Sequence, residues 1–397
     1  MFKNVNRVEY LVGNGDIKKI SNDIFNQKIC NFINDFSIKL KNHKSAKNFS
    51  DIRTLSFWCR KQNLSNLEKK FKTKEFRVGL GLAFHITPSN IPTNFAYSLI
   101  FGLLTGNTNI IKVPSKKFEQ ISIICSCLNN LINKKKYFDI KQKILVIRYK
   151  SDHEFTKFIS SVCDIRIIWG GDKSIMEIKR FPVKQKCLDI TFPDKYSLSI
   201  INSQKSLMLN NHEAKMLVRK FYNDTFIADQ NACSSPHLII WTGKEIKKAK
   251  NIFWNNLKDL VYKEYNMTEK ASIEKYTQLC ENLLNFKDIK SEKRYGNLIY
   301  TIELKKLNFD LHNLRGKWGY FFEYNSNDIS HLIKYFNDKF QTLTYFGFKK
   351  EYFQKLLSKK NFNCIDRIVP IGQALNIDLI WDGYDLTKML SKIIDIK

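Results

Sequence analysis

Apolar residues recur along this chain with two different spacings. Between residues 25 and 41, Ile29, Phe32, Ile33, Phe36 and Ile38 follow the spacing of an amphipathic helix. Residues 55–71 continue with a similar pattern. We therefore expect the first 75 residues to be helical.

From residue 77 onward, short apolar runs alternate with helical segments. The runs typical of buried strands are residues 77–86, 107–114, 143–149 and 164–171. The helical segments are residues 94–106, 115–136, 152–162 and 172–181. Gly106 suits the position just after a helix end. This alternation predicts βαβ units and a parallel sheet with helices on both faces.

After Pro193 the alternation is less regular. We expect helices at residues 210–226, 244–285 and 329–340, and strands at residues 237–241, 295–304, 317–324, 341–348 and 366–372. A chain of 397 residues is too long for one ordinary core. The fold class predicted is α/β, with two lobes that each contain a mainly parallel, Rossmann-like sheet. The predicted domains are residues 1–200 and 201–370, followed by a C-terminal segment, residues 371–397.

The composition is that of a globular protein with a large positive charge. Apolar residues make up 43% and charged residues 26%, and the net charge is +28. Such a charge attracts polyanions, but abundant Lys, Asn, Ile and Phe are also typical of an AT-rich genome. No nucleic-acid-binding module is visible, so nucleic acid is not an expected partner. Without an apolar run of roughly 18 residues or a signal peptide, we expect a cytoplasmic protein with no transmembrane segment.

Nine cysteines are scattered along the chain, an odd number without the spacing of a disulfide framework. Only Cys125 and Cys127 lie close together, and no second Cys/His pair matches them, so no metal site is expected. Cys233 lies in a polar loop of small residues after a predicted helix. A thiolate is a strong nucleophile near neutral pH. For one cysteine among nine, a structural role is the alternative, and His85, His153 and His237 are interpreted as structural.

Three further motifs follow predicted strands. In the PSN turn, Asn90 would lie at the carboxyl end of a buried strand, where its amide could donate to an oxyanion. Near Lys112, the cluster of Ser115, Lys116 and Lys117 has no acid before Glu119, a pattern that favours the 2′-phosphate of NADPH. The alternatives are a simple turn and a solvated helix start at Pro114–Ser115.

The third motif is a pair of glycines, Gly170 and Gly171, between a strand and a helix. Free backbone N–H groups at a helix start suit a pyrophosphate. A plain turn is the alternative, with Asp172 as the N-cap of the helix.

Together these segments resemble the LuxC-type fatty-acyl reductases of bacterial luminescence, a branch of the aldehyde-dehydrogenase superfamily. The resemblance extends from about Phe57 to Leu386. The segments that carry it are FWCRKQN, FHITPSNIP, GLLTGNTNIIKVPS, IIWGGDKSI, DITFPDKYS, DQNACSSPHLIIW, QTLTYFG, RIVPIGQAL and WDGYDL. It implies an aldehyde-dehydrogenase-like fold, with the NADP-binding domain first, a catalytic domain that carries Cys233, and a C-terminal segment that returns to the cofactor lobe or forms an oligomer contact.

The resemblance also implies residue roles. The PSNIP segment stands where aldehyde dehydrogenases carry PWNFP, which makes Asn90, with the backbone N–H of Cys233, the oxyanion hole. Among the cofactor-binding residues, Lys112 would hold the adenosine ribose and Ser115 replaces the Glu of NAD-preferring relatives. The remaining cofactor-binding residues implied are Thr87, Pro88, Lys116, Gly170 and Gly171.

One departure from the superfamily bears on the reaction. Aldehyde dehydrogenases that hydrolyse their acyl-enzyme carry Glu in an ELGG segment, whereas this chain reads LDITFPDKYS, with Asp189 and Asp194. The implied reaction is therefore reduction: Cys233 accepts the acyl group of an acyl-CoA or acyl-carrier thioester, and NADPH reduces it to an aldehyde. An acyl-activating ligase and a second copy of the chain are implied partners. The alternatives are a reductase for a short or polar activated acid in surface-polysaccharide or specialised-metabolite synthesis, and an inactive scaffold relative.

Overall fold

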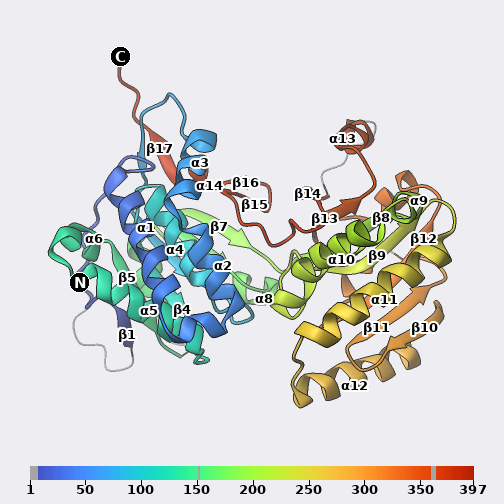
Figure 1. The fold of residues 1–397 in the computed structure, drawn as a ribbon. Coiled ribbons are helices and arrows are strands. Elements are labelled where there is room, and N and C mark those ends of the chain that lie inside the picture. The colour runs from blue at the N-terminus through green and yellow to red at the C-terminus, as the bar shows by residue number, and fades with distance from the viewer. Residues whose placement is uncertain (1–7, 151–152, 309, 359–363) are drawn as a thin grey trace. The chain divides into compact units, whose positions relative to one another are not determined.

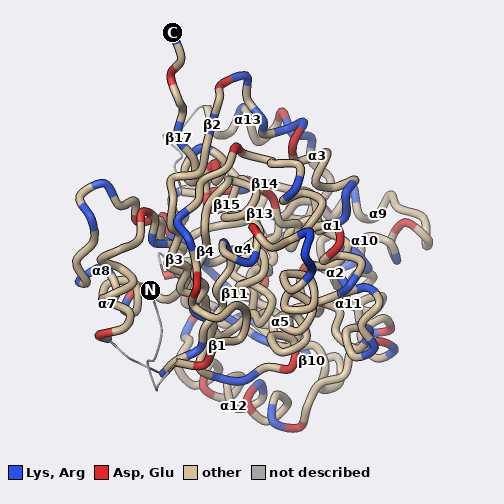
Figure 2. The backbone as a smooth tube through the Cα atoms, turned by 90° about the vertical axis from the view of Figure 1, so that its left-hand side faces the viewer, with Lys and Arg blue, Asp and Glu red and all other residues tan. Residues whose placement is uncertain are grey.

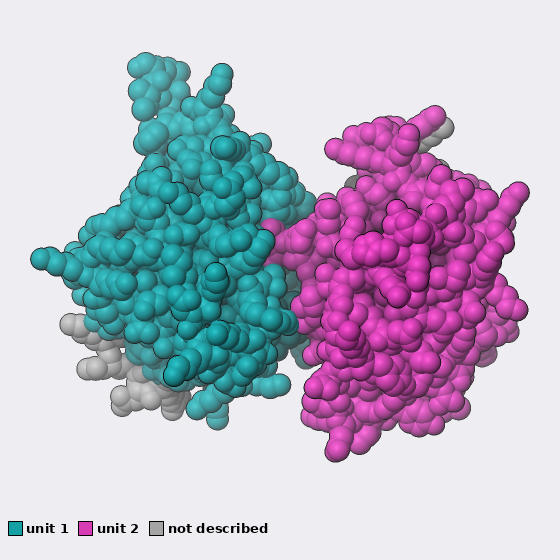
Figure 3. All heavy atoms as spheres, viewed as in Figure 1, with its two compact units in different colours: residues 1–194, 378–397 teal, residues 195–377 magenta. Residues whose placement is uncertain are grey.

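The computed structural model describes residues 8–150, 153–308, 310–358 and 364–397. The chain divides into two compact units, coloured separately in Figure 3. The first unit contains residues 1–194 and 378–397, and the second contains residues 195–377. The predicted α/β class with two mainly parallel sheets is confirmed. Lys and Arg are distributed over helices, strands and loops (Figure 2).

In its described part, the first unit has a six-stranded sheet with the order β1-β5-β4-β3-β6-β7 (Figure 1). These strands are β1 (Glu9–Val12), β3 (Leu82–Ile86), β4 (Thr108–Val113), β5 (Ile144–Arg148), β6 (Ile165–Trp169) and β7 (Leu188–Phe192). All neighbours are parallel except β1, which is antiparallel to β5. From β5 to β7 this is the strand order of a Rossmann sheet.

The helices of the first unit are α1 (Gln27–Asn42), α2 (Ser50–Trp58), α3 (Lys61–Phe71), α4 (Asn94–Leu104), α5 (Glu119–Ile132), α6 (Phe138–Lys141), α7 (His153–Val162), α8 (Asp172–Lys179) and α14 (Leu386–Met389). Successive β3 side chains point to opposite faces of the sheet. Phe84 packs in the same core as Ile159 of α7, whereas His85 contacts Ser98 of α4. Helices α7 and α4 therefore cover opposite faces, as predicted for a doubly wound sheet.

Four expectations for the N-terminal part are wrong. The four-residue strand β1 lies within the supposedly helical region. Ile38 is 49% exposed, because it stands nine residues after the buried Ile29 and thus on the opposite side of α1. The helix expected at residues 55–71 is two helices, since Asn34 caps the N–H of Lys61 and Asn63 caps the carbonyl of Trp58.

The fourth concerns residues 77–86, which form two strands instead of one. Gly81 has φ +136°, a conformation that ends the first strand. This first strand, β2 (Arg77–Gly79), pairs with β17 (Ser391–Ile393) near the C-terminus. Residues 380–385 form a small hairpin of β15 (Ile380–Trp381) and β16 (Tyr384–Asp385).

The second unit contains, among its described residues, a seven-stranded sheet with the order β10-β11-β12-β9-β8-β13-β14. Its strands are β8 (Tyr196–Asn202), β9 (Pro236–Thr242), β10 (Ile289–Tyr295), β11 (Ile299–Leu304), β12 (Tyr320–Ser326), β13 (Phe340–Phe346) and β14 (Arg367–Pro370). Only β10 is antiparallel to its neighbour. The helices are α9 (Ser203–Leu207), α10 (Asn211–Thr225), α11 (Ile246–Glu264), α12 (Glu269–Asn285) and α13 (Lys350–Ser358).

Strand β9 is buried on both sides and supplies both cores of this unit. Leu238 and Ile240 pack into one core, and Ile239 and Trp241 pack into the other with residues of α10 and α11. The helix expected at residues 329–340 is only a 3-10 helix over Ser330–Tyr335. Its apolar residues lie three or four positions apart, a spacing that fits both kinds of helix.

In the described part of the chain, each helix is either too short or too polar to span a bilayer.

Candidate active site

Three of the predicted motifs meet at one edge of the first sheet. Strand β3 lies between β4 and β6, with Ile86 in register with Lys112 on one side and Ile168 on the other. The turns that follow these parallel strands therefore leave the same edge. From β3 the next strands, β4 and β5, are added on one side, whereas β6 and β7 are added on the other side of β3. The direction in which strands are added thus reverses at β3. In such sheets, ligands bind in the crevice at this reversal.

The turn after β3 carries Asn90. Thr87 fixes the start of this turn, because its backbone N–H and its hydroxyl both donate to the carbonyl oxygen of Lys112, over 3.1 and 2.9 Å. Pro88 is half-buried, and Ser89 and Asn90 are exposed. The side-chain amide of Asn90 thus lies beyond the carboxyl end of the buried strand β3. Thr87 connects the start of this turn to the neighbouring strand β4.

Lys112 supplies a cation near the same edge. Its side chain is half-buried, and its Nζ lies 5.0 Å from the ring centroid of Tyr149. Burial lowers the pKa of Lys112. Among the described residues, no carboxylate forms an ion pair with it. A partly desolvated cation with no acidic neighbour fits a ligand that brings phosphate or hydroxyl oxygens.

Ser115, Lys116 and Lys117 are exposed in the loop after β4. The expectation that Pro114–Ser115 opens a helix is wrong, because α5 begins at Glu119. The positive end of a helix dipole favours an acid such as Glu119 in the first turn and disfavours two lysines. Ser115 and the two lysines thus stay in the loop.

Gly170 and Gly171 connect β6 to α8. The Gly170 N–H donates to the carbonyl of Phe192 at 3.2 Å, which fixes the turn. Gly171 is the N-cap of α8, so the expectation of Asp172 as N-cap is wrong. Gly171 has φ −68°, and no heavy atom lies within 4 Å of the position that a Cβ would occupy. Neither backbone strain nor packing requires glycine here, and the absent side chain leaves the start of α8 open to a ligand.

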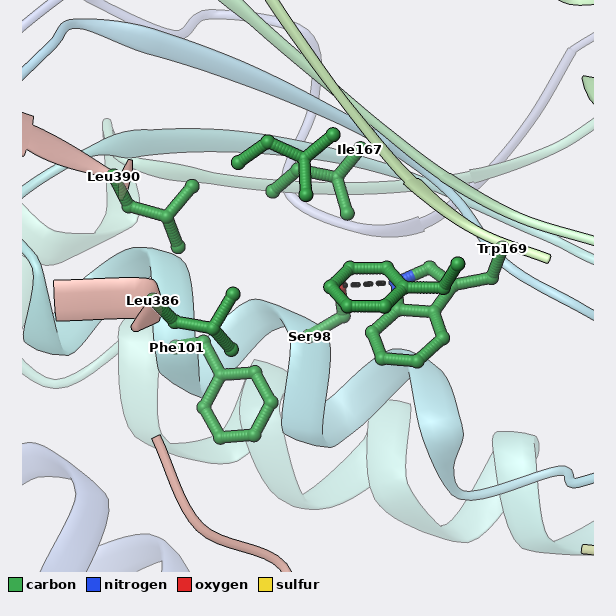
Figure 4. Close-up of a pocket in the computed structure, with 8 residues that line it drawn as sticks. Ser98, Phe101, Ile167, Trp169, Leu386 and Leu390 are labelled. Carbon is green, nitrogen blue, oxygen red and sulfur yellow. Dashed lines mark hydrogen bonds between the residues drawn. The ribbon is translucent and has the colours of Figure 1, made fainter. Parts of the chain in front are cut away.

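Next to the end of β6, aromatic side chains pack closely. Trp169 stacks on Phe192 with ring centroids 3.8 Å apart, and its Nε1 donates to Ser98 at 3.1 Å (Figure 4). The cavity in Figure 4 is only about 10 Å³, too small for more than one water molecule. Its lining residues are Ser98, Phe101, Ile167, Trp169, Ile190, Phe192, Leu386 and Leu390. It is therefore no substrate pocket.

In the second unit, Cys233 lies in the turn before β9, at the amino end of that sheet. Asp229 and Gln230 have φ of +51° and +59°, so the chain enters the turn in a conformation that non-glycine residues rarely adopt. The buried Gln230 amide holds this conformation. Its Nε2 donates to the carbonyls of Pro236 and Tyr320, both at 3.0 Å, and its Oε1 accepts from the N–H groups of Gly319 and Tyr320, both at 3.2 Å.

The backbone of Cys233 is also fixed. The buried Ser197 hydroxyl donates to the carbonyl oxygen of Cys233 at 2.6 Å and accepts from the N–H of Thr342 at 3.0 Å. Ser235, two residues further along the turn, donates to the carbonyl of Asp224 at 2.8 Å. Cys233 itself is half-buried. A thiol is thus presented on a rigid turn formed at the ends of β8, β9 and β13.

Several other cysteines are poor nucleophiles. Burial raises the pKa of Cys30 and Cys125 to about 12 and that of Cys127 to about 11. The pKa of the fully buried Cys59 is also raised. These thiols are protonated at neutral pH, and protonated thiols do not attack carbonyl groups.

His85 and His237 have structural roles, as expected. His85 is fully buried, with Nδ1 2.7 Å from the Ser98 hydroxyl and Nε2 3.0 Å from the Asn109 side-chain oxygen. His237 accepts from the N–H of Gly316 at 3.3 Å. Burial lowers the pKa of His85 to about 4 and that of His237 to about 3, so both are neutral. The side chain of His153 lies outside what the structure describes.

Asp189, in the segment that departs from ELGG, is engaged in an ion pair. Both of its carboxylate oxygens accept from the buried guanidinium of Arg166, at 2.8 and 2.7 Å. A carboxylate held by two charge-assisted hydrogen bonds is fixed toward its partner. It is therefore poorly suited to activate water.

The fold is that of aldehyde dehydrogenases. Aldehyde dehydrogenase 21 from Physcomitrella patens is similar with a TM-score of 0.63 at 10% identity, over 92% of this chain and 84% of that one. A benzaldehyde dehydrogenase from Corynebacterium glutamicum gives 0.62 at 10% identity, over 92% and 84%. The acyl-CoA reductase (LuxC) family matches residues 48–259, more than half of the chain. The chain belongs to this family.

Two curated proteins that are similar to this chain are long-chain acyl-protein thioester reductases. Long-chain acyl-protein thioester reductase 2 of Photobacterium leiognathi is 27% identical over 211 residues, which cover 50% of this chain and 41% of the relative. The long-chain acyl-protein thioester reductase of Aliivibrio fischeri is 27% identical over 168 residues, which cover 42% and 33%. The match thus spans less than half the length of either relative.

Proposed function

We propose that this protein reduces an activated acyl group to an aldehyde with NADPH, through a thioester on Cys233. The observation that carries the proposal is the presentation of Cys233, half-buried on a turn that Gln230 and Ser197 hold rigidly. Membership of the acyl-CoA reductase (LuxC) family and the likeness to acyl-protein thioester reductases support the same chemistry.

In the first half of the reaction, the Cys233 thiolate attacks the acyl carbonyl carbon. The carbonyl oxygen becomes an oxyanion, which the Asn90 amide and the Cys233 backbone N–H stabilise as donors. When this intermediate collapses, the bond to the thiol of coenzyme A or of an acyl carrier breaks. The acyl group is then a thioester on Cys233.

The cofactor is assigned to the turns of the first unit. The ammonium of Lys112 would hold the ribose, Ser115 and Lys116 would hold a 2′-phosphate, and Gly170 and Gly171 would leave room for the pyrophosphate. Thr87 and Pro88 would shape the wall beside it. When bound, the dihydronicotinamide supplies the hydride for the acyl carbon.

In the second half of the reaction, Asn90 and the same backbone N–H stabilise the oxygen of the reduced acyl group. Cys233 then leaves as a thiolate, and the aldehyde is released. Asp189 is engaged by Arg166 and the ELGG glutamate is missing, so the proposal predicts little hydrolysis of the thioester to the free acid.

The acyl donor in this proposal is a CoA thioester or an acyl-protein. Long-chain acids do not exchange onto a thiol without activation, so an acyl-activating ligase is the proposed partner upstream. We also propose that the chain associates with a second copy of itself.

Intact-mass measurement across a panel of acyl thioesters tests the assignment of Cys233. The wild-type chain should gain one acyl group, and Cys233→Ala should gain none. Cys280→Ala is the matched control, because Cys280 is also a half-buried free thiol of the second unit. Acylation that persists in a folded Cys233→Ala protein would overturn the proposal.

A further inference from the structure

Two cysteines that have no part in the acyl chemistry lie next to each other in the first unit. Cys163 stands two residues before the paired residue Ile165 of β6, and Cys187 stands one residue before Leu188 of β7. Their Sγ atoms are 3.8 Å apart. This pair lies at the amino ends of the two strands, whereas Gly170 follows the carboxyl end of β6.

The backbone positions are compatible with a disulfide. Ile165 and Leu188 are in register on parallel strands, and extending this register by one strand spacing and one residue step gives about 6 Å between the Cα atoms of Cys163 and Cys187, which lie just before the strands. Disulfides have Cα separations of roughly 4.4–6.8 Å. The Leu188 N–H donates to the carbonyl of Asp164 at 3.1 Å and holds the strand starts together. The two sulfurs need to approach by about 1.8 Å from their separation of 3.8 Å to reach the length of an S–S bond.

The two thiols differ in a way that gives each a role. Cys163 is fully buried, whereas Cys187 is only half-buried and accessible to a small molecule. The contact with Cys163 lowers the pKa of Cys187 below its ordinary value, and the same contact raises the pKa of Cys163. The nearby guanidinium of Arg166 acts in the same direction on Cys187, against the carboxylates of Asp189 and Asp164.

We propose that Cys163 and Cys187 are a redox modification site, at which a hydroperoxide converts the two thiols into a disulfide. The Cys187 thiolate attacks the peroxide, the O–O bond breaks, and the departing hydroxide or alkoxide takes up a proton; Cys187 becomes a sulfenic acid. The Cys163 sulfur then attacks the Cys187 sulfur, the S–O bond breaks, and water leaves with the second thiol proton. The peroxide is reduced by two electrons, and the dithiol is oxidised by two.

The experiment treats the full-length protein with one equivalent of hydrogen peroxide and measures its mass and its non-reduced peptides. The expected result is the loss of two hydrogens and a peptide pair joined through residues 163 and 187. Dithiothreitol should reverse both changes. The oxidised protein should also unfold at a higher temperature than the reduced protein, because the bond constrains the unfolded chain.

Matched variants separate this result from other oxidation. Cys163→Ser should accumulate oxygen on Cys187 without a cross-link, and Cys280→Ser should behave as wild type. Cys233→Ala should still form the cross-link, so the outcome is independent of the proposed acyl chemistry. The proposal would be overturned by a wild-type protein that gains oxygen at Cys187 but never loses two hydrogens. A Cys163→Ser variant that loses two hydrogens in the same yield as wild type would also overturn it.

Discussion

Buried polar side chains decide where the reactive groups of this chain stand. Gln230 satisfies four backbone groups around the Cys233 turn, and Ser197 fixes the carbonyl of Cys233. In the first unit, Thr87 ties the Asn90 turn to β4. Each of these three residues restricts the backbone beside a residue to which the proposed function gives a role.

At this scale the first prediction concerns Asn90. Asn90→Ala should lower turnover on the order of 10²–10³-fold, the usual loss for one oxyanion donor. Steady-state kinetics measure the effect, and the unfolding midpoint should not change because Asn90 is exposed. Ser89→Ala, the neighbouring exposed side chain, is the control and should retain activity. Full activity in Asn90→Ala would remove this residue from the oxyanion hole.

The second prediction concerns the pH dependence of stability. His85 has a pKa of about 4 in the folded chain and 6.5 as its ordinary value, so the unfolded chain binds the proton more tightly. Burial of neutral His85 therefore carries no proton-linked penalty above pH 6.5. As pH falls from 6.5 toward 4, the free energy of unfolding decreases by about 3 kcal/mol. His237 acts in the same direction.

Urea unfolding at pH 7 and pH 5 measures this effect. His85→Gln should show a smaller loss of stability between the two pH values than wild type. His212→Gln, at an exposed position on α10, should show the wild-type loss. An equal loss in His85→Gln would show that His85 is not the residue responsible.

Among whole elements, the turn before β9 is the one on which the site depends. Gln230→Ala would leave four buried backbone groups without partners and release the positive φ conformation at residues 229 and 230. We expect a loss of about 3 kcal/mol in stability and slower acylation of Cys233. Denaturant unfolding and acylation rates check this, with Gln62→Ala on the exposed face of α3 as the control. Unchanged acylation in the variant would mean that the turn needs no such support.

The sequence predicted the elements in which the spacing of apolar residues fits only a strand or only a helix. The runs of β4 (TNIIKV), β5 (ILVIR) and β6 (IRIIW) are short and rich in Ile and Val, and strands of this kind lie inside parallel sheets. Strand β10 was missed because its residues, IKSEKRY, are mostly exposed at the edge of the sheet. Residues 329–340 were predicted as a helix because Ile329, Leu332, Ile333 and Phe336 repeat with helical spacing. They are buried as expected, but by a 3-10 helix.

The site was predictable only in part. Asn90 and Gly171 follow strands that the pattern identifies and Lys112 lies at the end of one, so the motifs locate one edge of the first sheet. Ser197 and Gln230 had no such signal, since their partners lie up to 145 residues away in sequence. The choice of Cys233 among nine cysteines rested on the family resemblance rather than on the spacing of residues.

At the scale of the whole molecule, the chain forms its first unit from two separate segments. Residues 378–397 return to it, where β17 pairs with β2. The buried guanidinium of Arg77 donates to the Ser391 hydroxyl and carbonyl at 2.9 and 3.0 Å, and to the Lys388 carbonyl at 3.2 Å. One side chain thus anchors the C-terminal segment.

We predict that Arg77→Met weakens this anchor. The variant should lose about 2 kcal/mol of stability, because buried carbonyls lose their donor. Limited proteolysis with mass detection should show earlier cleavage within residues 378–397. Lys392→Ala, an exposed position on β17, should be cleaved like wild type. Identical protection in Arg77→Met would assign the anchoring to the other contacts of this segment, namely the pairing of β17 with β2 and the hydrogen bond from Asn107 to the Leu390 carbonyl.

The central claim is that the acyl group passes through Cys233 on its way to the aldehyde. The most direct test isolates the acylated protein, maps the adduct to a peptide, and then adds NADPH without further acyl donor. The account predicts an adduct on Cys233 and one aldehyde formed for each adduct lost, more slowly with NADH. An adduct on another residue, or an adduct that persists or is released only as free acid, would contradict it.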